Sequence, residues 1–272
     1  MVAIPKSNRL KDIIELQLIE EELRPYIGMS GLGQKCRRKI WYDFRWAYVQ
    51  EFTPRQLRIF ERGDLEETRV IFTLLDNGME VISVQDEIVD ETGHIKGHID
   101  GLVCNVPGAE KTKHLLEIKT MNDKRFNEYA KQENLKTTNF PYYVQINQYM
   151  GRLGLSRCLF VVSNKNNEER IYSRISFDEE NFREYKEVGF DILTSEGPPK
   201  RIGSRVWYEC KFCDARQICH FNKPIAKSCR SCVHVSIEQN GAWHCSLLNT
   251  ILPEATQRVG CDNYMLDEMF NN

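Results

Sequence analysis

Two short stretches, Gly97-His98-Ile99-Asp100-Gly101 and Leu115-Leu116-Glu117-Ile118-Lys119-Thr120, place charged side chains in apolar sequence that is typical of buried strands. Successive side chains of a strand point to opposite faces, so Glu117 and Lys119 share one face while Ile118 points into the core. Asp100 would come from a neighbouring strand. Two carboxylates and a lysine at one sheet edge are what metal-dependent phosphodiester hydrolysis requires: oxygen ligands for Mg²⁺ or Mn²⁺ and a positive charge near the phosphate.

The sequence before Asp100 predicts the strands that bring it to Glu117. Apolar residues at 81–84 and 88–89 are followed by the turn-forming cluster Asp90-Glu91-Thr92-Gly93 and by a third strand over 95–103. A hairpin followed by this strand would place Asp100 beside Glu117. The remaining patterns predict strands over 158–163 and 170–177, and helices over 7–25, 141–153 and 179–193. We therefore expect an α/β fold with a mixed sheet flanked by helices.

Two helical segments carry polar residues that suit the same chemistry. The first begins at Phe60, contains Arg62-Gly63 and the adjacent acids Glu66-Glu67, and ends at Asn77-Gly78. The second, 141–153, holds Gln145 and Tyr149 on one face. With the two strands, these helices resemble the PD-(D/E)xK nuclease superfamily in its RecB-like branch. That branch has R-G-x-x-x-(H/E) in a helix, then G-x-I-D-G, E-x-K and Q-x-x-x-Y, and all four stand here in order across residues 62 to 149.

The resemblance implies a restriction-endonuclease-like fold and a set of ligands for the catalytic metal. Asp100 and Glu117 would hold the ion together with the backbone carbonyl of Ile118. Glu67, four residues after Gly63, would be the helix ligand, and the adjacent Glu66 is the open alternative.

It also implies roles for the other motif residues. Lys119 would orient the attacking water and offset charge that develops on the phosphate. Gln145 and Tyr149 would line the site and contact the nucleic-acid backbone or Lys119. His98 would border the site without a catalytic role.

Ten cysteines are the second large signal. Clustered thiols in an intracellular chain are better explained as metal ligands than as disulfides. The first set is Cys210-x2-Cys213-x5-Cys219, with Cys36 as the remote candidate for a fourth ligand. This arrangement resembles the iron–sulfur nucleases of the RecB-like branch, including the AddB type and the CRISPR-associated spacer-trimming nucleases. The resemblance implies a 4Fe-4S cluster that ties the chain ends together, and Zn²⁺ is the alternative because both sites use four thiolates.

The second set resembles a small zinc-ribbon-like module and consists of Cys229, Cys232, Cys245 and Cys261. The segment has too few apolar residues for an independent core, so a Zn²⁺ ion would supply the missing stability. Alternative ligands are His220, His234 and His244. We expect a nuclease domain over 1–222, which includes the first set, and a zinc-binding module over 223–272. Cys104 and Cys158 lie in strand-like sequence and are expected to be buried core thiols.

Composition limits the remaining choices. With 272 residues, the chain can hold one sizeable α/β core and a small appendage. It has neither an apolar run of the ~20 residues that span a bilayer nor a secretory signal, so we expect a cytoplasmic protein without membrane contact. The net charge of −2 argues for a local basic track rather than a generally basic surface. Candidates for the track are Arg37-Arg38-Lys39, Arg45 and the stretch 124–136.

The sequence as a whole predicts a metal-dependent DNA nuclease, similar to the exonucleases of phage replication and recombination modules. Its substrate would be single- or double-stranded DNA ends. Without a P-loop or helicase motif, unwinding would depend on a helicase, and a single-strand-binding or recombinase protein is a further partner. The alternatives are a spacer-trimming nuclease of CRISPR adaptation and a non-catalytic DNA-binding protein on the same fold.

Overall fold

The computed structural model describes residues 24–50 and 52–271. Its centre is a five-stranded mixed sheet in the order β2-β5-β6-β7-β8, in which only β6 and β7 are parallel. The strands are β2 (Glu80–Ile82), β5 (Gly101–Cys104), β6 (His114–Met121), β7 (Arg157–Asn164) and β8 (Arg170–Ser176). The predicted mixed sheet is confirmed. The predicted helix over 7–25 lies almost wholly outside the described residues.

The strand predicted over 95–103 is wrong as a single element, because the chain changes sheets within it. β4 (Ile95–His98) pairs with β3 (Glu87–Val89) and β1 (Ile27–Gly28) in a separate small sheet, whereas β5 joins the central one. At the break, the backbone of Ile99 bonds to the 83–86 loop: its N–H donates to Asp86 and its carbonyl accepts from Gln85. Asp100 therefore lies at the junction of two sheets.

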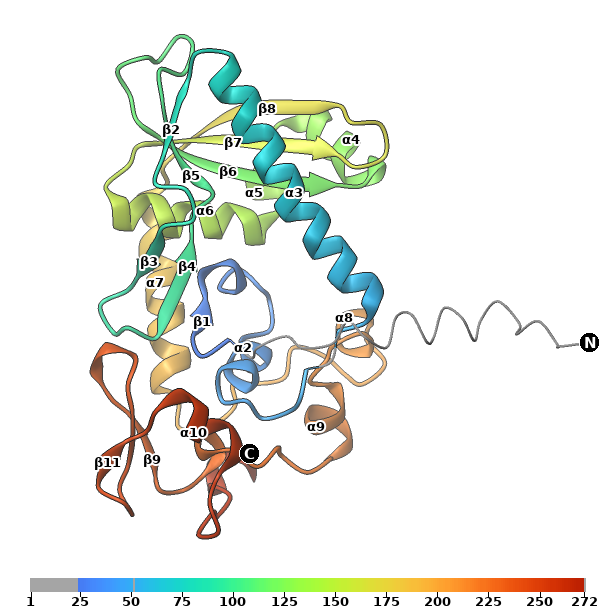
Figure 1. Ribbon diagram of the computed structural model, residues 1–272. Coiled ribbons are helices and arrows are strands. Elements are labelled where there is room, and N and C mark those ends of the chain that lie inside the picture. The colour runs from blue at the N-terminus through green and yellow to red at the C-terminus, as the bar shows by residue number, and fades with distance from the viewer. Residues whose placement is uncertain (1–23, 51, 272) are drawn as a thin grey trace, which may run out of the picture.

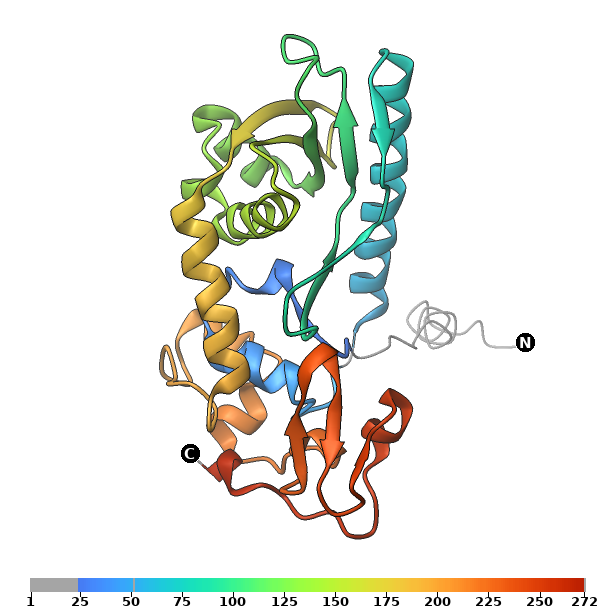
Figure 2. The ribbon, with the colours of Figure 1, turned by 90° about the vertical axis from the view of Figure 1, so that its left-hand side faces the viewer.

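Helices cover both faces of the central sheet. The long helix α3 (Pro54–Asp76) packs on one face through Val70 and Leu74, and a capping box at Thr53 starts it. On the other face lie α4 (Asp123–Gln132), α5 (Leu135–Thr138) and α6 (Phe140–Leu153), as Figures 1 and 2 show. The cleft described below opens between α3 and α6.

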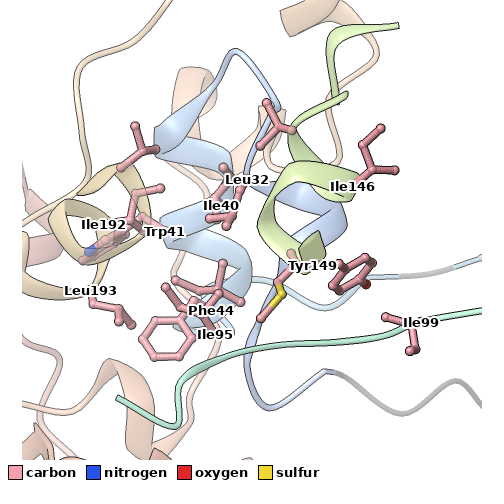
Figure 3. Close-up of a cluster of buried hydrophobic side chains, with 14 of the residues drawn as sticks. Leu32, Ile40, Trp41, Phe44, Ile95, Ile99, Ile146, Tyr149, Ile192 and Leu193 are labelled. Carbon is pink, nitrogen blue, oxygen red and sulfur yellow. The ribbon is translucent and has the colours of Figure 1, made fainter. Parts of the chain in front are cut away.

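A second part of the core lies beneath the central sheet, where segments distant in sequence meet. It contains the 3₁₀ helix η1 (Met29–Gly31), α2 (Arg37–Phe44) and α7 (Glu179–Thr194). Figure 3 shows Trp41 and Ile40 of α2 beside Ile192 of α7, with Ile95 of β4 close by. This packing fixes β1 and η1, which form the lower wall of the cleft.

The cysteine-rich end consists of short elements at the lower end of the molecule (Figure 1). β9, β10 and β11 form an antiparallel sheet whose Trp243 side chain is fully buried against Phe44, with ring centroids 5.1 Å apart. The buried Arg230 guanidinium lies 3.8 Å from the ring centroid of Trp46. The segment thus joins the main core, and a domain division at residue 222 stays a prediction. Its elements are α8 (Tyr208–Lys211), α9 (Arg216–Phe221), η2 (Cys229–Ser231), β9 (Val235–Ile237), η3 (Gln239–Gly241), β10 (Trp243–Cys245), β11 (Thr250–Ile251), α10 (Glu254–Val259) and η4 (Glu268–Asn271).

Two of the basic residues proposed for a nucleic-acid track are structural instead. Arg38 is buried and donates to the carbonyls of Pro198 and Pro199. Arg45 is buried between the rings of Trp41 and Trp243. For these two the prediction of nucleic-acid contact is wrong, because both guanidinium groups are buried and bind partners inside the protein. Their neighbours in the sequence did not indicate these internal contacts.

Among the remaining candidates for this track, Arg37 faces Asp191 at 3.8 Å, Lys39 pairs with Asp43 at 2.7 Å and Lys136 pairs with Asp178 at 3.1 Å. Of the two lone cysteines, Cys158 is fully buried as expected, but Cys104 is only half-buried, which corrects that expectation. No helix within 24–50 and 52–271 is long and apolar enough to cross a membrane.

Candidate active site

A cleft of about 600 Å³ lies between α3, β4, α6 and the end of β6. Five of the predicted site residues line this cleft. Asp100 and Glu117 do not line it, but each contacts a residue that does: Asp100 contacts Ile118, and Glu117 contacts Lys119. His98 also lines the cleft from the end of β4, as an exposed side chain. The five are Glu67, Ile118, Lys119, Gln145 and Tyr149.

Asp100 occupies the junction between the two sheets. Its carboxylate is 6% exposed and accepts a hydrogen bond of 2.6 Å from the backbone N–H of Ile118. Burial raises its pKa, and the positive charge of Lys119 opposes that shift. The bond to Ile118 fixes one oxygen of this acid next to β6.

Glu117 and Lys119 meet on one face of β6, as the strand alternation predicts. Lys119 Nζ lies 2.5 Å from Glu117 Oε1. Burial raises the pKa of Glu117 to about 8, with a further contribution from Asp100. Burial alone would lower the pKa of Lys119, but the two carboxylates outweigh it and raise the pKa.

The Glu117 carboxylate is fully buried. Its Oε1 faces the Lys119 ammonium, and its Oε2 has no hydrogen-bond partner within the described residues. A buried polar group normally has a hydrogen-bond partner, because an unsatisfied one costs free energy. Apart from the ion pair with Lys119, this carboxylate has no such compensation.

The adjacent acids of α3 point to different places. Glu67 turns to the cleft, where Gln85 donates a hydrogen bond of 3.1 Å to it. Burial and the charge of Asp100 raise the pKa of Glu67 to about 7. Glu66 turns away and accepts from Arg170 at 2.7 Å and from Ser163 at 2.7 Å. Of the two candidate helix ligands, Glu67 is therefore the one that faces the cleft.

Gln145 and Tyr149 form the α6 side of the cleft. Tyr149 is 2% exposed and lies so close to Gly97 that a Cβ there would be 2.3 Å from its hydroxyl. Gln145 is buried, and in the described part of the chain its Oε1 has no hydrogen-bond partner. Neither contacts Lys119 through a hydrogen bond given by the structure. The glycine of the G-x-I-D-G motif is thus needed to admit Tyr149.

Three residues at the site were missed in the sequence. Asp64 lies one turn before Glu67 on the same face of α3, and its charge raises the pKa of both Glu67 and Asp100. Tyr142 lies three residues before Gln145, with its ring centroid 5.5 Å from Lys119 Nζ. Helical spacing from Glu67 and Gln145 could have indicated Asp64 and Tyr142. The third residue, Gln85, lies in a loop, and no sequence pattern indicated that it would reach the cleft.

The carboxylates of Asp100, Glu117 and Glu67 are the oxygen donors that a hard divalent cation prefers, although they do not form a complete coordination shell. In the part of the chain that the structure describes, no three Cys, His, Asp or Glu side chains are gathered as a group that could hold a metal ion. Mg²⁺ commonly binds through one or two carboxylates and keeps several waters, so it does not need such a group. The Glu117 carboxylate, whose Oε1 faces Lys119 and whose Oε2 has no partner among the described residues, fits that mode of binding together with Asp100.

The first cysteine set is brought together from distant segments. Cys36 caps the start of α2, and together with Cys210, Cys213 and Cys219 it lines one small cavity. Burial raises the pKa of Cys36, and the nearby Cys219 and Cys210 add to this shift. His220 lines the same cavity. Four thiols are the donor type of a Cys₄ centre, either zinc or iron–sulfur, although no three of them are gathered closely enough in the described residues to form a metal site by themselves.

The second set lines another small cavity, beside the β9–β11 sheet. Burial raises the pKa of Cys229, and Cys261, Cys232 and Cys245 contribute in that order. His234 lines this cavity, and His244 does not. All ten cysteines are free thiols. The four cysteines are again the donor type of a Cys₄ centre, but within residues 24–50 and 52–271 they are not gathered as a finished metal site.

Comparison with known proteins gives likenesses of fold alone. No family model matches the chain, and no curated protein matches it. Among solved structures, LHK-Exo in complex with dAMP is 21% identical with a TM-score of 0.47, over 62% of this chain and 86% of that one. LHK-Exo is described as an alkaline exonuclease from Laribacter hongkongensis. A phage-related exonuclease from Haemophilus somnus is 15% identical with a TM-score of 0.42, over 61% and 91%. Sequence identities this low show a likeness of fold and do not establish an activity.

Proposed function

We propose that this protein is a metal-dependent deoxyribonuclease of the PD-(D/E)xK class. The observation that carries the proposal is the fully buried Glu117 carboxylate at the wall of a cleft, which lies beside Asp100 and for which the described residues offer Lys119 alone as a partner. A divalent cation would supply the compensation that this acid lacks.

Each residue of the cleft has a role in this proposal. Asp100, Glu117 and Glu67 would hold Mg²⁺ or Mn²⁺, with the Ile118 carbonyl as a backbone ligand. When bound, such an ion activates water and offsets charge on the phosphate. Lys119 donates a hydrogen bond to the attacking water and stabilises negative charge on the phosphate oxygens.

The α6 side of the cleft positions the substrate. The side-chain amide N–H groups of Gln145 would donate to phosphate oxygens of the nucleic-acid backbone. Tyr149 packs on Gly97 and holds β4 against α6, so its role is to position the wall rather than to react.

The finer assignments rest on the resemblance of the sequence motifs. We propose that the enzyme is an exonuclease that acts on DNA ends in replication or recombination of the phage type. We also propose a 4Fe-4S cluster or Zn²⁺ at the first cysteine set, and Zn²⁺ in a zinc-ribbon-like module at the second.

Digestion of end-labelled DNA tests the function. The wild-type protein should degrade single- or double-stranded DNA with Mg²⁺ or Mn²⁺ and not with chelator. Asp100→Ala and Lys119→Ala should each slow the reaction by at least about 100-fold, since both remove charge from the reacting centre. Lys113→Ala, which removes an exposed lysine at the edge of β6, is the matched control. Equal rates for all four proteins would refute the site. DNA binding without cleavage would support the non-catalytic alternative.

A further inference from the structure

The segment 200–223, which includes α8 and α9, carries an unusual concentration of positive charge. It contains six Lys or Arg and two acidic residues, a net charge of +4, in a chain whose net charge is −2. Both acids are occupied: Glu209 pairs with Lys35 at 2.8 Å, and Asp214 faces Lys39 at 3.8 Å. None of the six basic side chains forms an ion pair within residues 24–50 and 52–271. Their charge is thus available to a partner.

Aromatic rings lie among these charges on the same segment. Tyr208 is 73% exposed and Phe212 is 69% exposed, and their ring centroids are 5.3 Å apart. The Arg216 guanidinium lies 4.9 Å from the ring centroid of Phe221. Trp207 is held over Gly203, where a Cβ would be 2.4 Å from its ring. Large exposed rings among cations are the features with which proteins stack unpaired bases and follow a phosphate backbone.

Three neighbouring hollows, of which the cleft is the first, extend to this surface, and each shares lining residues with the next. The cleft shares Tyr26 and Phe60 with a second hollow of about 410 Å³, which aromatic side chains line. That hollow shares Gln34 and Lys39 with a groove of about 390 Å³ beside the start of α6. Phe212 lines this groove. The exposed rings of 200–223 therefore stand at the far end of a path that begins at Lys119.

We propose that the 200–223 surface binds the single-stranded part of a DNA substrate whose scissile phosphate lies in the cleft, an inference that rests on the proposed nuclease function. Unpaired bases present their faces to Tyr208 and Phe212, whereas the bases of a duplex are stacked on one another and cannot. The phosphates lie along the unpaired basic side chains. The surface thus selects substrates with an unpaired strand.

Binding measurements in a cleavage-deficient background test this inference. All proteins carry Asp100→Asn, so that the DNA stays intact with Mg²⁺ present, and fluorescence anisotropy follows labelled oligothymidylates of about 20 and about 4 nucleotides. We expect the added pair Tyr208→Ala and Phe212→Ala to weaken binding of the long strand about tenfold and to leave the short strand unchanged. Phe72→Ala is the matched control, since Phe72 is 61% exposed on α3 and lines none of the three hollows.

A second pair of substitutions is needed because Tyr208 and Phe212 flank Cys210 and Cys213, and their loss could disturb that cysteine set. Lys200 and Lys223 lie at the two ends of the segment. The double substitution Lys200→Glu and Lys223→Glu should weaken binding of the long strand and make that binding less dependent on salt concentration. Unchanged affinity in both pairs, or no binding by the parent protein, would overturn the inference. An equal loss on a fully paired duplex would overturn the single-strand assignment. If the wild type fails to cleave DNA while these binding differences appear, the nuclease function fails and the binding surface stands.

Discussion

Successive side chains of an α-helix point about 100° apart, and in α3 this separates two adjacent carboxylates. Glu67 turns to the cleft, while Glu66 pairs with Arg170 behind it. The sequence left these two open because the helix face that packs on the sheet depends on residues far along the chain, Ser163 and Arg170 among them.

Substitutions of Glu66 and Glu67 should have different effects on cleavage and on stability. Glu67→Gln should lower the cleavage rate without lowering the free energy of unfolding, because burial and Asp100 disfavour the charge of Glu67 in the folded protein. Glu66→Gln should lower that free energy by about 3 kcal/mol, because it leaves the Arg170 guanidinium without its charged partner. Denaturant unfolding and digestion of labelled DNA measure the two effects. The reverse pattern would assign the helix ligand to Glu66.

Gly97 offers a test of the packing that holds the α6 wall. A Cβ at this position would lie 2.3 Å from the Tyr149 hydroxyl and 2.8 Å from its ring. Gly97→Ala should therefore cost about 1–3 kcal/mol of unfolding free energy by overpacking. Gly63→Ala is the control: nothing lies within 4 Å of its Cβ, so it should stabilise α3 by about 0.5–1 kcal/mol. Equal effects in denaturant unfolding would contradict this account.

At the scale of elements, the start of α7 depends on the charge of Asp178. Its carboxylate accepts from the backbone N–H of Asn181, from Tyr143 and from Lys136, and these bonds hold its pKa at about 2. Because the folded pKa lies below the unfolded value of ~3.9, the stabilisation is complete above that value and is lost as the pH falls toward 2.

Asp178→Ala should accordingly cost about 1 kcal/mol near neutral pH, and the difference from wild type should close between pH ~4 and ~2. Asn122→Ala is the matched control, since Asn122 caps α4 through an uncharged side chain that accepts from Arg125. Its cost should not change over the same interval. Denaturant midpoints across that pH range measure both, and a constant cost for Asp178→Ala would count against the charge as the cause.

Local periodicity predicted the strands of the central sheet and the helices α3, α6 and α7, but it missed α2, α4 and the junction at Ile99. The alternation along β6 placed Glu117 and Lys119 on one face, and the helical spacing in α6 placed Gln145 with Tyr149, because both patterns involve neighbours in sequence. The break at Ile99 depends on hydrogen bonds to the 83–86 loop and on which sheet each half joins. Such pairing is decided by long-range contacts, which residue patterns do not carry.

At the scale of the whole molecule, the first cysteine set brings residues from two distant segments to one cavity. Cys36 lies at the start of α2, and Cys210, Cys213 and Cys219 belong to the distant α8–α9 region. The spacing of the later three indicated a centre that needs a fourth ligand. Cys36 was the remote candidate for it, and the family resemblance agreed with that choice. A centre that joins them closes a long loop and adds metal-binding free energy to folding.

Cys36→Ser should therefore remove metal from the first set and lower the unfolding temperature by about 5 °C or more. Cys104→Ser is the control, because Cys104 lines neither cavity. Anaerobic purification with iron, zinc and sulfide analysis, followed by thermal unfolding, measures the effect and distinguishes a cluster from Zn²⁺. Unchanged metal content and midpoint in Cys36→Ser would refute the clasp.

The central claim is that the buried acid of β6 serves a divalent cation in DNA cleavage. The most direct measurement is the cleavage rate of end-labelled DNA as a function of Mg²⁺ concentration for wild type and Glu117→Gln. The substitution keeps the size of the side chain and removes its charge. The account predicts cation-dependent cleavage by wild type and a rate at least about 100-fold lower for Glu117→Gln at every Mg²⁺ concentration. Equal rates for the two proteins would contradict it.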